Sequence, residues 1–226
     1  LAVIGLGAIG ALVANAAAQG FGMDVVGYDP YISVAHAWAL SRAIHRADSV
    51  EEAVKDADYI TVHIPLTDST KGMINEAFIK SLKKGVRIMN FSRGELADPE
   101  AIKAAIAEEQ LAAYVTDFSS PALADTPKVI CLPHLGASTP ESEERCAEMA
   151  ANEIKDYLER GVIRNSVNLP EIVLGTPEGS RVLLIHKNVP GVVSSISSLI
   201  SGRGINIQNM LNKSRGDMAV TVLELV

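Results

Sequence analysis

The chain has 226 residues, of which 48% are hydrophobic and 21% charged, and its formal net charge is −7. This length is sufficient for one large domain or two small ones, each with an apolar core. The acidic balance argues against a nucleic-acid-binding surface, because nothing would offset the repulsion from phosphate groups. No apolar run has the length of a membrane span, and no signal peptide is visible. We therefore expect a cytoplasmic protein that binds neither nucleic acid nor membrane.

The first ten residues, LAVIGLGAIG, form an apolar run of strand length that ends in a glycine-rich turn before a predicted helix, Ala11–Gln19. In this G-x-G-x-x-G pattern, Gly5 permits the tight turn, Gly7 lets the backbone approach a pyrophosphate, and Gly10 lets the helix pack closely on the sheet. Taken alone, the pattern is weak evidence, because a simple turn also explains it. A second strand, Met23–Tyr28, ends in Asp29, 19 residues after Gly10, where a carboxylate can bind an adenosine ribose. Together these features predict a dinucleotide site.

Strands and helices then alternate up to residue 132. Capping residues predict where three helices begin: Ser49 before a helix to Lys55, Asn75 before one to Leu82, and Asp98 followed by Pro99 before one to Glu109. A further helix is predicted over Val34–Leu40, which contains the only tryptophan, Trp38. Four more strands are predicted over Asp58–Val62, Val86–Phe91, Ala112–Thr116 and Val129–Leu132. This alternation predicts an α/β fold with a doubly wound parallel sheet. We expect Trp38 to be a packing residue, and Cys131 and Cys146, which have no metal-ligand spacing, to be reduced core thiols.

A long helix is predicted from Thr139 to Gly161, with an apolar stripe that must pack against another surface. Residues 165–180 are rich in Asn, Pro and Gly and are interpreted as a linker. A strand over 182–185, a helix from Val192, and a hairpin formed by Ile205–Asn212 and Met218–Val226 follow. This β-α-β-β order is the first two-thirds of a ferredoxin-like module. We therefore predict a Rossmann domain over 1–164, in which 139–161 crosses toward another domain, and a truncated second domain over 181–226.

Two side chains that follow strands have the chemistry that a nicotinamide enzyme requires. Arg93, in Asn-Phe-Ser-Arg-Gly, has a planar fork that can hold a carboxylate or carbonyl oxygen in two hydrogen bonds. His134, in Pro-His-Leu-Gly-Ala-Ser-Thr, has the free pKa near neutrality that suits proton exchange with a hydroxyl group. Each also has an ordinary structural interpretation, and so does His63, which we interpret as a loop residue beside the cofactor.

These motifs, in this order and spacing, resemble the D-isomer-specific 2-hydroxyacid dehydrogenases over residues 1 to about 170. The resemblance implies NAD as cofactor, with no metal, and it implies roles for particular residues. Arg93 would hold the substrate, and His134 would donate and accept the proton. Asp29 would bind the adenosine ribose, and Asp117 the nicotinamide carboxamide. The other cofactor-binding residues implied by the resemblance are Gly5, Gly7, Ala8, Ile9, Gly10, Pro65, Phe91, Ser92, Leu135, Gly136 and Ala137.

One position departs from the family pattern. The family usually has a glutamate a few residues after the position of Asp117 and just before a proline. In the family this glutamate orients the catalytic histidine. Here Ser120 stands at that point, before Pro121, and Asp125 is the only other acid nearby. Either catalysis proceeds without this partner, or another acid replaces it. We also expect the chain to be a fragment that lacks the family's substrate domain and turns over no substrate by itself.

The second unit resembles an ACT domain from His186-Lys187-Asn188 to Gly204-Ile205-Asn206. This combination is typical of family members that oxidise 3-phospho-D-glycerate in serine biosynthesis. It implies a homo-oligomer and L-serine as an effector bound by His186, Asn188 and Asn206. Two alternatives remain open at this point. One is another D-2-hydroxyacid dehydrogenase, such as a hydroxypyruvate/glyoxylate reductase, and the other is a non-catalytic NAD-binding regulator.

Overall fold

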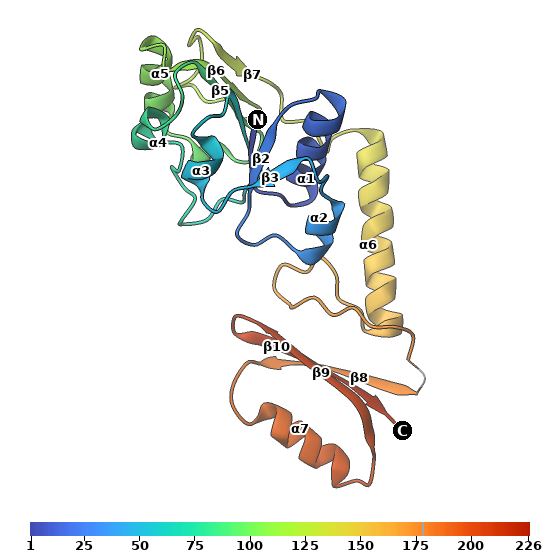
Figure 1. Ribbon diagram of the computed structural model, residues 1–226. Coiled ribbons are helices and arrows are strands. Elements are labelled where there is room, and N and C mark those ends of the chain that lie inside the picture. Colours follow the sequence, from blue (N-terminus) through green and yellow to red (C-terminus); the bar gives the residue numbers. More distant parts are fainter. Residues whose placement is uncertain (178) are drawn as a thin grey trace. The chain divides into compact units, whose positions relative to one another are not determined.

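The computed structural model describes residues 1–177 and 179–226, which divide into two units, Leu1–His134 and Leu135–Val226 (Figure 1). Glu178, inside the expected linker 165–180, lies outside the described residues. The expected domain boundaries at 164 and 181 differ from this division, in which the long helix belongs to the second unit, and they stay a prediction. Among the described residues, no helix is long and apolar enough to cross a membrane.

A seven-stranded parallel sheet forms the centre of the first unit. Its order is β3-β2-β1-β4-β5-β6-β7, so β1 lies between β2 and β4, with Val3 opposite Gly27 on one side and Thr61 on the other. The chain leaves β1 for one half of the sheet and returns to build the other half, which confirms the doubly wound fold. The strands are β1 (Ala2–Ile4), β2 (Val25–Tyr28), β3 (Ile44–Arg46), β4 (Tyr59–Val62), β5 (Val86–Asn90), β6 (Leu111–Thr116) and β7 (Val129–Cys131).

Helices cover both faces of this sheet. Val3 packs with Ala14 and Ala17 on one face, and the alternate residues Ala2 and Ile4 belong to the larger core on the other face. The predicted caps are confirmed: the side chains of Ser49, Asn75 and Asp98 each accept a hydrogen bond from a backbone N–H of the helix that follows. The helices are α1 (Ala8–Asn15) with a π-helical turn (Ala16–Gly20), α2 (Val34–Ala39), α3 (Val50–Val54), α4 (Glu76–Lys80), a 3-10 turn (Gly94–Leu96) and α5 (Pro99–Ala107).

The second unit contains one long helix and a separate antiparallel sheet. The long helix is α6 (Pro140–Arg160), capped by the Thr139 side chain, and the module that follows is β8 (Ser180–Lys187), α7 (Val192–Ser201), β9 (Ile207–Arg215) and β10 (Met218–Leu225). The sheet order β8-β10-β9 and the β-α-β-β sequence confirm the predicted partial ferredoxin-like module. The segment expected to be a linker contributes to the core of this unit, because its residue Ile172 is buried in one cluster with Ile163 and with Val220 and Val222 of β10.

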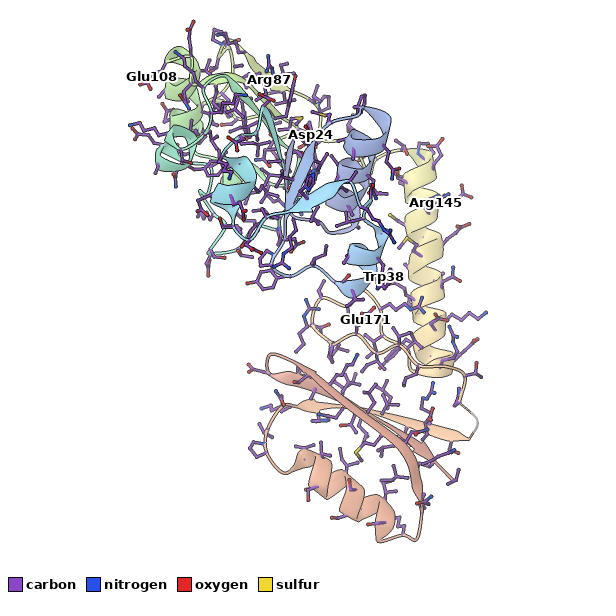
Figure 2. The ribbon with its side chains drawn as sticks, in the orientation of Figure 1. Asp24, Trp38, Arg87, Glu108, Arg145 and Glu171 are labelled. Atoms are coloured by element: carbon purple, nitrogen blue, oxygen red, sulfur yellow. The ribbon has the colours of Figure 1, made fainter. Side chains whose placement is uncertain are left out.

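Three residues expected in the core are exposed instead. Trp38 projects from α2 and is 85% exposed (Figure 2). Cys131 ends β7, and Cys146 lies on α6, where Met149, Ile154 and Leu158 are also exposed. A sequence pattern reports that a residue is apolar, but it does not report whether another element covers that residue.

Candidate functional site

The glycine-rich loop joins β1 to α1 at the carboxyl end of the parallel strands. Gly5 has φ +89°, and its backbone N–H donates to the carbonyl of Tyr28 over 2.8 Å, which ties the loop to β2. A Cβ atom on Gly10 would lie 1.9 Å from the Gly5 carbonyl oxygen, so only glycine permits the close approach of α1. Next to Gly7, in contrast, no described atom lies within 4 Å of the Cβ position. This open space next to the backbone is what a bound pyrophosphate requires.

The N-terminus of α1 faces this loop. Gly7 is its N-cap, and among the described residues no side chain caps it. The first backbone N–H groups of a helix have no partner within the helix, and they form the positive end of its dipole. Ala8 and Ile9, both exposed, carry such groups. The loop and the start of α1 therefore suit an anionic diphosphate.

Asp29 is held in place by backbone donors on both of its carboxylate oxygens. Oδ2 accepts from the N–H of Leu6 over 2.9 Å, and Oδ1 accepts from the N–H of Tyr31 over 2.8 Å. Each oxygen of a carboxylate has a further lone pair, so the group retains acceptor capacity for a ribose hydroxyl. A cavity of about 640 Å³ lies beside it, and Gly7, Asp29, His63 and Pro65 all line this cavity. Its volume is typical of a cofactor site.

The loop after β4 also lines this cavity. Nε2 of His63 lies 3.0 Å from the hydroxyl of Thr61, and burial lowers the pKa of His63 below its usual 6.5. Pro65 is fixed by Thr70, whose hydroxyl donates to the Pro65 carbonyl over 2.8 Å. Sequence reasoning did not identify Thr70. The only signal for it was a cluster of hydroxyl residues, Thr67, Ser69 and Thr70, in one short loop.

The loop after β5 carries Phe91, Ser92 and Arg93, and a buried asparagine organises it. Asn90 is 0% exposed, its Nδ2 donates to the Arg93 carbonyl over 2.8 Å, and its Oδ1 accepts from the Ser92 N–H over 3.1 Å. The Ser92 hydroxyl donates to the Val62 carbonyl over 2.6 Å, which joins this loop to β4. Asn90 has no role in the sequence-based site, although an amide at the end of an apolar strand was a usable signal.

Arg93 is exposed at the end of this loop. Its Nη1 donates to the carbonyl of Ser92 over 2.6 Å, so the guanidinium folds back on its own loop. The other guanidinium N–H groups can serve as donors to a carboxylate. Phe91, on the same loop, is 38% exposed and offers an apolar surface.

His134 contacts a carboxylate that directly follows β6. Its Nδ1 lies 2.8 Å from Oδ2 of Asp117, and its ring packs at a tilt against Phe118, with the ring centroids 4.6 Å apart. The Asp117 side chain is 15% exposed and that of His134 57% exposed. The other oxygen of Asp117, Oδ1, is buried and has no hydrogen-bond partner among the described residues. An amide donor from a nicotinamide ring would satisfy it, so these residues fit the cofactor.

Ser120, at the position of the family's glutamate, and the nearby acid Asp125 make no hydrogen bond to His134 among the described residues. The Ser120 hydroxyl accepts from the N–H of Ala122 over 3.2 Å, so this side chain builds a local turn. Asp125 is exposed and has φ +58° in the same turn. Leu135, Gly136 and Ala137 are exposed and belong to the second unit, so the structure does not place them against the cavity.

The expected effector residues do not meet within one chain. Nε2 of His186 lies 2.8 Å from the hydroxyl of Thr221, and Asn188 donates to the Gly216 carbonyl over 3.2 Å, both near the start of β10. Asn206 instead pairs through its backbone with Val226, beyond the other end of β10. Seven residues of strand separate these two ends, or about 23 Å. One small effector molecule therefore cannot contact both groups within a single copy of the chain.

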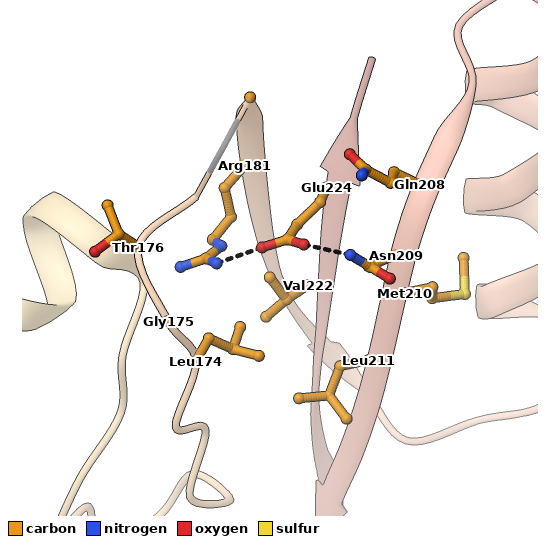
Figure 3. A pocket seen from close by; sticks show the side chains of 11 residues that line it. Leu174, Gly175, Thr176, Arg181, Gln208, Asn209, Met210, Leu211, Val222 and Glu224 are labelled. Carbon is orange, nitrogen blue, oxygen red and sulfur yellow. Dashed lines mark hydrogen bonds and ion pairs between the residues drawn. The ribbon is translucent and has the colours of Figure 1, made fainter.

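A further cavity of about 480 Å³ lies in the second unit, beside residues 174–176 and strands β9 and β10 (Figure 3). Arg181 forms an ion pair with Glu224 there and donates to the Arg160 carbonyl over 2.6 Å. Asn209 donates to the other carboxylate oxygen of Glu224 over 2.6 Å. Hydrogen bonds from Arg181 and Asn209 lower the pKa of Glu224. The network joins the end of α6 to the sheet, so we assign it a structural role. Within the described part of the chain, no three His, Cys, Asp or Glu side chains converge as in a metal site.

Known proteins support the interpretation of the first unit. The family model described as "D-isomer specific 2-hydroxyacid dehydrogenase, NAD binding domain" matches residues 1–136. The D-3-phosphoglycerate dehydrogenase of Methanocaldococcus jannaschii is 39% identical over 178 residues, covering 76% of this chain and 33% of that protein. The enzyme of the same name from Haemophilus influenzae is 32% identical over 220 residues, covering 92% of this chain and 52% of that protein. The chain thus spans about a third to a half of these relatives.

Solved structures give the same family. The D-mandelate dehydrogenase of Rhodotorula graminis has a TM-score of 0.62 and 29% identity, covering 69% of this chain and 47% of that structure. An NAD-complexed D-isomer specific 2-hydroxyacid dehydrogenase from Lactobacillus delbrueckii ssp. bulgaricus has a TM-score of 0.62 and 26% identity, covering 74% of this chain and 55% of that structure. From its glycine-rich loop to His134, this chain belongs to the D-isomer specific 2-hydroxyacid dehydrogenases, and its first unit is their NAD-binding domain.

Proposed function

We propose that the native protein oxidises 3-phospho-D-glycerate to 3-phosphooxypyruvate with NAD, the first step of L-serine synthesis. The observation that carries this proposal is the extent of the similarity. The match to the Haemophilus influenzae enzyme covers 92% of the chain and so includes most of the ferredoxin-like module. The match to D-mandelate dehydrogenase covers only 69% of the chain. A module shared with the phosphoglycerate enzymes favours their substrate, and we interpret it as an ACT domain.

The residues of the first unit have separate roles in this proposal. The glycine-rich loop and the start of α1 bind the pyrophosphate, and Asp29 binds the adenosine ribose. Pro65, Phe91 and Ser92 line the cofactor site. When bound, NAD supplies the acceptor for the hydride that leaves the substrate carbon. We assign Arg93 to the substrate's carboxylate or carbonyl oxygen, where a planar fork provides two parallel hydrogen bonds.

His134 is the proton carrier in this proposal. During oxidation, the O–H bond of the substrate hydroxyl breaks, and its proton passes to the imidazole. In the reverse direction the same ring returns the proton to the carbonyl oxygen. An imidazole suits both directions because its unperturbed pKa lies near neutrality. The exposed His134 side chain is accessible to a substrate, as this role requires.

The substrate assignment is tested by NADH formation in the native protein with a panel of acids. The panel contains 3-phospho-D-glycerate, D-glycerate, D-lactate and glycolate at equal concentration. We expect kcat/KM for the phosphorylated acid to exceed the others by at least about 10²-fold, because a site built for a polar group rejects analogues that lack it. A higher value for another acid would assign a different dehydrogenase. No turnover of any acid, with NAD binding intact, would favour a regulator.

A further inference from the structure

The contact between His134 and Asp117 joins two segments that are distant in the chain. Asp117 follows β6 directly, and His134 follows β7, which pairs with β6 in parallel. The carboxyl ends of neighbouring parallel strands lie at one edge of the sheet, so the fold itself places these two side chains together. The 2.8 Å contact therefore joins a residue that directly follows β6 to one that lies three residues beyond the end of β7.

The histidine ring is held on two sides. Asp117 contacts Nδ1, and Phe118 packs against the ring with the centroids 4.6 Å apart. Phe118 is itself positioned, because its backbone N–H donates to the buried hydroxyl of Thr116 over 3.1 Å. No hydrogen bond within residues 1–177 and 179–226 uses Nε2 of His134. Nε2 is therefore the ring atom that remains available to a substrate.

A carboxylate at Nδ1 determines which nitrogen carries the proton in the neutral ring. Asp117 can only accept, so the proton stays on Nδ1 and the lone pair stays on Nε2. It also stabilises the imidazolium that forms when Nε2 takes a proton. A carboxylate on the far nitrogen of a catalytic histidine has this effect in other enzymes. The pair therefore has the geometry of a proton acceptor oriented by an acid.

Neither Ser120, at the position of the family's glutamate, nor the nearby acid Asp125 has this geometry. Asp125 is exposed, lies in a turn, and makes no hydrogen bond to His134 among the described residues. Ser120 carries no charge, and its hydroxyl builds the turn. We propose that Asp117 is the positioning residue of His134 and supplies the carboxylate that the chain lacks at position 120. This inference rests on the proposed role of His134 as proton carrier.

The first test is the tautomer of His134, measured by nitrogen NMR on the chain itself with labelled histidine. The chain has five histidines, and the signal of His134 is identified as the one that is missing in His134→Gln. We expect the neutral wild-type ring to carry its proton on Nδ1. In Asp117→Asn the amide can donate to Nδ1, so the proton should move to Nε2. Asp125→Asn is the matched control and should leave the tautomer unchanged. A proton on Nε2 in the wild type, or an unchanged tautomer in Asp117→Asn, would overturn the proposal.

The second test is kinetic and uses the native protein. We expect Asp117→Asn to reduce kcat by about 10²–10⁴-fold while KM for the acid changes little, because substrate contacts are retained. Asp125→Asn should retain wild-type kcat. An unchanged kcat in Asp117→Asn would overturn the proposal. If the wild type oxidises no hydroxy acid but the tautomer still depends on Asp117, the positioning stands and the proposed function fails.

Discussion

The Oδ2 atom of Asp29 accepts a hydrogen bond from the backbone N–H of Leu6 over 2.9 Å. This bond connects the end of β2 to the middle of the glycine-rich loop. The carboxylate is therefore held between the loop and the cavity of about 640 Å³, and it cannot turn away from a bound ribose without losing a backbone partner. Cofactor preference should depend on this one side chain.

We expect the chain to bind NAD much more tightly than NADP. A 2′-phosphate would lie against the Asp29 carboxylate, and like charges at close range repel strongly. Calorimetry with both cofactors measures the preference directly. Asp29→Asn should reduce the ratio of NAD affinity to NADP affinity. The control Asp24→Asn, at the opposite end of β2, should leave this ratio unchanged. Equal affinity of the wild-type chain for the two cofactors would remove the role of Asp29.

Two glycines of the loop should respond differently to alanine. Gly10→Ala places a Cβ 1.9 Å from the Gly5 carbonyl, so we expect a loss of folding stability of at least about 1–3 kcal/mol. Gly7→Ala meets no described atom within 4 Å and has φ −70°, so stability should change by no more than about 0.5 kcal/mol. NAD binding should nevertheless be lost, because the new methyl group occupies the space of the pyrophosphate. Thermal unfolding and calorimetry separate the two effects. Wild-type NAD affinity in Gly7→Ala would contradict the assigned site.

Local features of the fold could be predicted from the sequence. Ser49, Asn75 and Asp98 begin their helices as expected, because a cap depends on the few residues that follow it. Helix α1 begins at Ala8 and not at Ala11, because the glycine-rich turn is completed at Gly7. The short edge strand β3 was not predicted. Its three residues, Ile44–Arg46, form no alternating pattern long enough to recognise.

Contacts between distant segments could not be predicted. The sequence showed Ser120 at the position of the family's glutamate and left open whether another acid replaces it, and the observed partner of His134 is Asp117, 17 residues away. That pairing follows from the parallel register of β6 and β7, which no local pattern reports. For the same reason, Ile172 was placed in a linker by composition, although it is fully buried against β10.

Folding stability should decrease as the pH falls through the range in which His63 titrates. Burial lowers the pKa of His63 below its usual 6.5, so the unfolded chain takes up this proton at a higher pH than the folded chain. The contribution of neutral His63 to the free energy of unfolding is therefore retained above pH 6.5. It decreases as the pH falls from 6.5 to the lower pKa that His63 has in the folded chain. Thermal unfolding at pH 7.5 and 5.5, values on either side of about 6.5, should show a smaller decrease in His63→Gln than in the wild type. His45→Gln, at an exposed position, is the control. Identical pH dependence in His63→Gln and the wild type would contradict the prediction.

L-serine should inhibit the native protein, and inhibition should require two chains. His186 and Asn206 lie at opposite ends of β10, so an effector that contacts both must lie between two copies. Serine titration of turnover should show weaker inhibition in His186→Ala and Asn206→Ala, with the exposed Gln208→Ala as control. Ultracentrifugation should show a homo-oligomer. Inhibition that persists unchanged in both variants would place the effector elsewhere, and no inhibition in the wild type would leave the module a role in assembly alone.

The central claim is that His134 carries the proton in an NAD-dependent oxidation of 3-phospho-D-glycerate. The most direct measurement is the initial rate of NADH formation by the native protein and by His134→Ala, with NAD affinity measured in parallel. We predict a loss in kcat of about 10²–10⁴-fold with NAD affinity nearly unchanged, whereas Arg93→Ala should mainly raise KM for the acid. Near-wild-type turnover by His134→Ala across the pH range would show that another group carries the proton, and it would contradict the account.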